Sequence, residues 1–151
     1  MLTAAFWNAN VRDNSNEIAP FFAAWTDFTP TFVQGVTVTY TKRRTRYLQI
    51  GKLVIAQISV DFTSAGTGGA VLAMSLPATV VSVDDWNLVG SFFFYDANVP
   101  ARYVGNLLLF DSSTAFLQHG GTTANGALGT NPAITVANGD QFSCNLLYEA
   151  T

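Results

Sequence analysis

Charged side chains are scarce in this chain of 151 residues, and their scarcity limits the kinds of protein it can be. Asp, Glu, Lys and Arg together make up 11% of the residues, whereas hydrophobic residues make up 49%. An ordinary soluble domain carries about 25% charged residues. Because so little polar surface is available to coat an isolated monomer, we expect part of the exterior to be an interface with other chains.

Basic residues are too few for general binding to nucleic acids. The net charge is -3 at pH 7 and the isoelectric point is about 4.7, whereas binding to a phosphate backbone needs a surplus of Lys and Arg. No stretch approaches the ~18 apolar residues of a membrane helix, and the amino terminus lacks the pattern of a signal peptide. We therefore expect neither a nucleic-acid partner nor a membrane.

Residues that commonly carry chemistry are equally rare. The one histidine, His119, is predicted to lie in a loop, so a nucleophile would have no obvious base. The one cysteine, Cys144, excludes an intrachain disulfide and alternates with apolar residues, which predicts a buried thiol. Asp84 and Asp85 precede Trp86, but neighbouring residues of a strand point to opposite faces, which favours a polar turn over a paired-carboxylate site. The sequence thus predicts no catalytic, cofactor or metal site, and no enzyme.

The first 30 residues differ from the rest of the chain in their pattern of apolar and polar residues. Ala4, Trp7 and Val11 recur at helical spacing, so residues 1–16 are predicted to form a short N-terminal helical arm. Residues 17–30 sustain no period and are interrupted by Pro20 and Pro30, so they are predicted to form an extended linker. The linker is too rich in aromatic residues for a free tether, and we expect its aromatic side chains to dock on another surface.

Beyond residue 30 the pattern becomes that of β-strands. Apolar side chains alternate with polar ones along residues 36–41 and 54–62, and further strands are expected over residues 71–76, 88–95, 102–110, 114–118 and 141–149. Gly, Asn, Asp and Pro clusters separate these segments. Residues 31–151 are therefore predicted to be an all-β domain, an antiparallel β-sandwich or jelly roll, preceded by one short N-terminal helix.

Two of the expected strands are apolar on both faces. A second sheet would cover one face, and another subunit would cover the other, because no helix is expected after the arm. The alternative is that long loops, such as residues 119–133, fold back over the sheet. The residues predicted to form the subunit interface are Phe92, Phe93, Phe94, Tyr95, Leu107, Leu108 and Leu109.

The sharpest cluster of charge is a run of basic residues at positions 42–46. In an extended conformation Lys42, Arg44 and Arg46 would share one face. They would either contact an acidic neighbour in an assembly or keep a sheet edge from pairing with other strands. Both interpretations remain open from the residues alone.

Several short motifs are shared with a known family. The segments FTPT (28–31), RYLQIGKLV (46–54) and MSLP (74–77), and the closing NGDQF (138–142) and LYEA (147–150), resemble a domain of virion proteins from phages that infect actinobacteria. The segment LTAAFWNANVRDN (2–14) resembles an amino-terminal motif of phage tail-fibre and other virion proteins. The resemblance implies a β-sandwich that works as a homotrimer, with no catalytic residues.

The resemblance also implies that the arm attaches the protein to the particle. On this interpretation the attachment residues are Leu2, Phe6, Trp7, Val11, Arg12, Phe21, Phe22 and Trp25. The partners would be copies of the same chain and the major capsid protein or tail proteins, on a virion surface assembled in the host cytoplasm.

Two roles fit this setting. The first is a capsid decoration or cement protein that forms a trimeric knob on the head, which suits a chain with no heptads or repeats that could build a fibre shaft. The alternative is a minor tail or receptor-binding protein at the tail tip, in which Trp86 and the loop over residues 120–131 would recognise host-surface glycan. The same fold would serve either role.

Overall fold

The computed structural model describes residues 3–4, 19, 24–81, 87–120 and 125–151, and these form an almost entirely β structure. The strands are β1 (Thr26–Asp27), β2 (Phe32–Gln34), β3 (Val36–Val38), β4 (Tyr40–Ile50), β5 (Leu53–Phe62), β6 (Ala73–Ser75), β7 (Leu88–Asp96), β8 (Ala101–Asp111), β9 (Thr114–Gly120), β10 (Asn125–Ala127) and β11 (Gln141–Glu149). All pairings between them are antiparallel. The predicted all-β class is confirmed.

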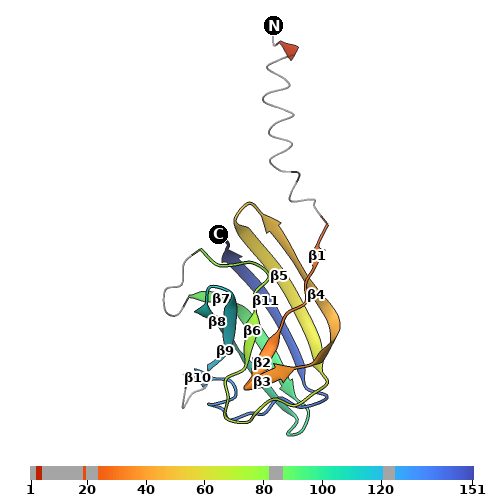
Figure 1. The fold of residues 1–151 in the computed structure, drawn as a ribbon, viewed down its shortest axis with the longest axis vertical. Helices are drawn as coiled ribbons and strands as arrows, with labels where there is room; N and C mark the ends of the chain where they lie inside the picture. The colour runs from red at the N-terminus through yellow and green to blue at the C-terminus, as the bar shows by residue number, and fades with distance from the viewer. Residues whose placement is uncertain (1–2, 5–18, 20–23, 82–86, 121–124) are drawn as a thin grey trace.

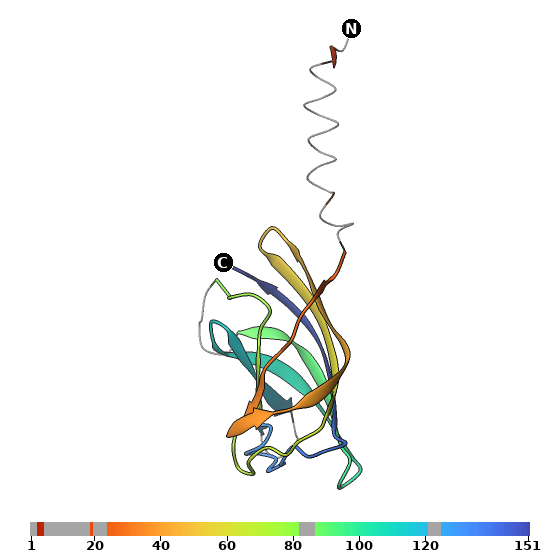
Figure 2. The ribbon, with the colours of Figure 1, turned by 45° about the vertical axis from the view of Figure 1, so that its right-hand side comes forward.

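The strands form one continuous sheet that curls back over itself. Its order is β1-β4-β5-β11-β7-β8-β9-β6-β2-β3, with β10 added beside β9. Figures 1 and 2 show β2, β3 and β6 lying across the interior from β4, β5 and β11. The curl gives the molecule two layers with a core between them, which is the arrangement of a β-sandwich.

Most of the longer strands lie where the sequence predicts them, and β3 and β6 fall within the segments expected over residues 36–41 and 71–76. However, β4 extends to Ile50, well beyond the predicted segment, and β1, β2 and β10 were missed. The segments expected over residues 54–62, 88–95, 102–110, 114–118 and 141–149 correspond to β5, β7, β8, β9 and β11. In contrast, β1, β2 and β10 have two or three residues each, too few for a period to be recognised. Gly35 joins β2 to β3 with φ of 69°, and a Cβ at that position would lie 2.7 Å from the Thr67 side chain.

The boundary between linker and domain needs a correction. Thr26 and Asp27 pair with Tyr47 and Arg46 of β4, so the end of the predicted linker is an edge strand of the sheet. It was missed because backbone pairing with β4 depends on tertiary contact and leaves no pattern in so short a strand. The predicted helix of the arm lies outside the described residues, apart from Thr3 and Ala4.

Alternate residues of the long central strands build the core. In β5 the buried side chains are Val54, Ala56, Ile58, Val60 and Phe62, and in β11 they are Phe142, Cys144, Leu146 and Tyr148. Phe32 of β2 meets them from the opposite layer, with ring centroids 5.1 Å from Phe62 and 5.2 Å from Phe142 in edge-on geometry. Such aromatic pairs add about 0.5–1.5 kcal/mol each beyond their burial.

Loops close the end of the core opposite the β4–β5 turn. Leu128, Ile134 and Val136 are buried, so the described part of the long loop does fold back over the sheet, on its inner side. The fully buried amide of Gln34 holds this loop in place. Its Nε2 donates to the carbonyl oxygens of Ala70 (3.2 Å) and Ile134 (2.7 Å), and its Oε1 accepts from the backbone nitrogen of Val136 (2.9 Å).

Replacing Phe32 by alanine tests whether this ring joins the two layers. We expect Phe32→Ala to lower the free energy of unfolding by about 3–5 kcal/mol, because it leaves a cavity where both layers meet. The measurement is urea unfolding followed by circular dichroism. Val33→Ala is the matched control, since Val33 is on the same strand but 39% exposed. Equal losses in the two variants would contradict the role given to Phe32.

Candidate functional site

Most of the predicted attachment residues lie outside the described part of the chain. Leu2, Phe6, Trp7, Val11, Arg12, Phe21 and Phe22 all belong to that set. Trp25 is described, and it lies just before β1 on the outside of β4. The guanidinium carbon of Arg46 lies 4.5 Å from the centroid of a Trp25 ring. Trp25 is therefore partly engaged within the domain, through a cation–π contact.

The basic cluster is divided by a β-bulge. The register between β4 and β5 shifts between Lys42 and Arg44. Lys42 consequently pairs with the inward-facing Val60, and its Nζ contacts the Thr29 hydroxyl at 2.5 Å. The prediction that Lys42 shares one face with Arg44 and Arg46 was wrong, because the bulge inserts an extra residue into the alternation.

The other basic residues of the cluster lie on the outer face of the sheet. Arg43 pairs with Asp61, with 2.6 Å between Nε and Oδ2. Arg46 donates from Nε and Nη2 to Oε1 of Gln57, at 3.2 and 2.8 Å. Arg44 is exposed and has no acidic partner among the described residues. Its guanidinium is therefore available to a ligand.

The predicted subunit interface needs a larger correction. Four of its residues belong to the core of the single chain: Phe92, Phe94, Leu107 and Leu109. Their side chains face the core, so another subunit cannot reach them. Phe93, Tyr95 and Leu108 alternate with them on the outer face, where Phe93 and Tyr95 are half-buried and Leu108 is buried. The inner face is covered by the chain's own second layer, as expected, and by loops. The apolar pattern alone did not show which residues of the two strands face inward.

A continuous apolar row crosses the outer face instead. Strand pairing places Leu48 beside Ile55 and Ile55 beside Leu147, and it places Leu88 beside Leu108 and Leu108 beside Phe116. Ile55, Leu147 and Leu88 line one open groove, which joins the two halves of the row. We call these six residues the apolar row. Phe110, in contact with Phe116 at 6.4 Å between centroids, extends it.

A polar hollow lies beside the apolar row on the same face. It measures about 310 Å³ and is lined by outward side chains of β4, β5, β11 and β7 together with neighbouring core atoms. Its outward residues are Arg44, Gln57, Ser59, Ser91, Phe93, Ser143 and Asn145. None of them is Lys, Asp or Glu, so Arg44 is the one charged residue among them. We refer to this feature as the polar hollow.

Sequence reasoning named Leu108, Phe93 and Arg44 as site residues, but it missed the apolar row and the polar hollow to which they belong. The individual strands carried part of the signal, because Leu48 and Leu147 are apolar at positions that the alternation assigns to solvent. What the sequence does not contain is the register that aligns them with Ile55, Leu88 and Phe116. Side chains on strands distant in sequence become one surface only after the strands pair.

Of the residues considered for chemistry, the structure describes His119 and Cys144. His119 lies on β9 and not in a loop, with its Nδ1 3.0 Å from the carbonyl oxygen of Val104. Burial raises the pKa of the Cys144 thiol well above its usual range, and such a thiol is unreactive. Asp84, Asp85 and Trp86, proposed for glycan contact or a carboxylate site, lie outside the described residues.

Two general searches covered the described residues only. Within them, no group of three or more His, Cys, Asp or Glu side chains is placed to hold a metal ion. The same part of the chain contains no helix with the length and apolar character needed to cross a membrane.

Comparisons with known proteins leave the family open. The chain was compared with models of protein families, with curated proteins and with solved structures, and none of the three comparisons found a match.

Proposed function

We propose that this chain is a structural protein on the surface of a tailed-phage particle, a capsid decoration protein that assembles into a trimeric knob. The particle setting rests on the motifs that resemble actinobacteriophage virion proteins. The assembly rests on one observation of the fold, the apolar row on the outer face of the sheet. The proposed partners are copies of the same chain and the major capsid protein.

Part of the apolar row is strongly exposed, although Leu108 within it is buried. Leu88 and Leu147 are each 59% exposed, and the adjoining Phe110 is 67% exposed. These positions are not scattered, because Leu88 and Leu147 line the same groove and Phe110 contacts Phe116 of the row. Contiguous apolar surface of this kind marks interaction sites. Few charged residues are present to keep it in water. Association of this face with another copy would remove it from solvent.

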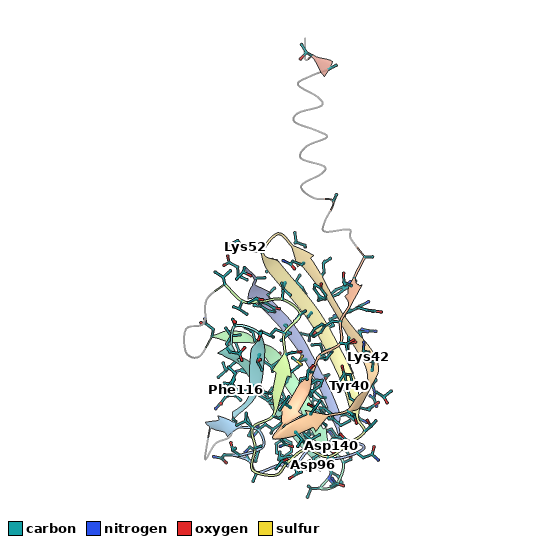
Figure 3. All side chains as sticks on the ribbon, viewed as in Figure 1. Tyr40, Lys42, Lys52, Asp96, Phe116 and Asp140 are labelled. Atoms are coloured by element: carbon teal, nitrogen blue, oxygen red, sulfur yellow. The ribbon has the colours of Figure 1, made fainter. Side chains whose placement is uncertain are left out.

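The N-terminal arm would join the domain at one end of the sheet, which suits attachment of that end to the particle. β1, the β4–β5 turn with Lys52, and the C-terminal Thr151 lie at the same end of the sheet (Figure 1). The β7–β8 turn after Asp96 and the loop carrying Asp140 lie at the other end (Figure 3). An arm that precedes β1 would hold the first end against the particle, and the second end would face outward.

The oligomeric state tests the apolar row. We expect the purified full-length chain to have a solution mass of about three times 16.2 kDa by light scattering. Leu147→Asp should yield monomers, because a charge would be buried in the interface without a partner. Val99→Asp, at an equally exposed apolar position on the β7–β8 turn, should remain trimeric. A monomeric wild-type chain would contradict the proposed assembly.

Deleting the arm tests the mode of attachment. Removal of residues 1–16 should leave a folded domain that no longer binds phage particles, because the described sheet and core contain none of these residues. Binding is measured by cosedimentation with particles that lack the protein, and folding by circular dichroism. A truncated chain that still cosediments would show that the arm is not the anchor.

The position on the particle separates the two roles. With an antibody against the protein, electron microscopy of particles should show label over the head. Label confined to the tail tip would reject decoration and favour the receptor-binding role. Particles without the protein should also lose heat tolerance, because a ligand that binds only the intact state stabilises that state by mass action.

A further inference from the structure

The polar hollow has a built shape that follows from strand register. Arg44 of β4 lies beside Ser59 of β5, Ser59 beside Ser143 of β11, and Ser143 beside Phe93 of β7. Since neighbouring strands are about 4.8 Å apart, the backbones of Arg44 and Phe93 are roughly 14 Å apart, with only the two serines between them. A large side chain therefore stands on each side of a floor made of short hydroxyl side chains.

The next row of the sheet supplies amide groups to the same hollow. Gln57 pairs with Asn145, and Asn145 pairs with Ser91. The side chains of Asn145, Ser59 and Ser143 form no hydrogen bond with any other described residue. Amide and hydroxyl groups can both donate and accept hydrogen bonds. The hollow thus offers several uncommitted donors and acceptors on a rigid sheet.

These groups together define the chemistry of a ligand. The guanidinium of Arg44 matches a carboxylate, which it can bind through two parallel hydrogen bonds. The ring of Phe93, half-buried, presents an apolar surface on the opposite side. The amides and hydroxyls between them match a dense set of ligand hydroxyls. We propose that the polar hollow binds an acidic oligosaccharide, with a uronic acid carboxylate on Arg44 and the apolar face of a sugar ring on Phe93.

The position of the hollow argues against a peptide as the ligand. A peptide strand usually binds by adding to an exposed sheet edge, through main-chain hydrogen bonds. The hollow lies over β5, β11 and β7, and each of these strands is already paired on both sides. Recognition must therefore come from side chains, and those present are suited to hydroxyl groups and one anion.

The inference does not rest on the proposed particle role, and it is compatible with the proposed assembly. The row of Gln57, Asn145 and Ser91 separates the serine floor of the hollow from the apolar row. If subunits associate through the apolar row, the polar hollow lies next to the interface and stays accessible to a ligand. Ligand binding and oligomeric state can be measured separately on the same purified chain.

The test is calorimetric titration of the full-length chain at low salt with trimers of galacturonate, glucuronate and mannuronate. We expect at least one of them to bind, and the neutral trimer of the corresponding sugar to bind about tenfold more weakly or less. Arg44→Ala should weaken binding of the acidic trimer by about tenfold or more. Ser143→Leu should abolish binding by filling the floor, with the fold retained by circular dichroism.

Two controls separate the site from simple charge effects. Lys52→Ala removes a positive charge at the β4–β5 turn, away from the hollow, and should leave binding unchanged. A triglutamate peptide should not bind. The proposal is overturned if none of the three acidic trimers binds, if Arg44→Ala and Ser143→Leu leave binding intact, or if the peptide binds with the same dependence on Arg44.

Discussion

The contact on which the structure depends is the meeting of Phe32 with Phe62 and Phe142. A single antiparallel sheet has one face that needs cover, and here the cover is the sheet's own far end. Phe32 comes from the short strand β2 and inserts edge-on between rings of two long central strands. The curl that brings these rings together creates the two layers, buries the inner residues of every long strand, and turns the other face of the sheet outward.

The outer face follows from the same constraint. One side of each long strand packs against the core. The side chains on its other side face outward, and strand register aligns them into rows that cross the sheet. One row is apolar, from Leu48 to Phe116, and the neighbouring rows carry amides, hydroxyls and Arg44. The two surfaces considered for function, one for association and one for a ligand, are products of pairing between strands that are distant in the chain.

A β-bulge in β4 and the buried amide of Gln34 modify the regular sheet locally. The bulge between Lys42 and Arg44 directs the first of these toward Thr29 and keeps the second on the outer face. Without it, the basic cluster would have been presented as one surface, as the simple alternation of a strand predicts. Gln34 supplies the hydrogen bonds that let an irregular loop close the core without leaving buried backbone groups unpaired.

The amino-acid sequence by itself determined the all-β class and the extent of most long strands, because the alternation along β5 or β11 is a local property of consecutive residues. The extent of β4 was not predicted. It also determined that Cys144 is buried, since its neighbours in the alternation are core residues. The tertiary structure alone decided that Phe92 and Leu107 belong to the core and not to an interface. It likewise decided that Leu147 and Leu88 adjoin and that Arg44 faces Phe93 across two serines. The physical reason is that register and curl are set by contacts between distant strands.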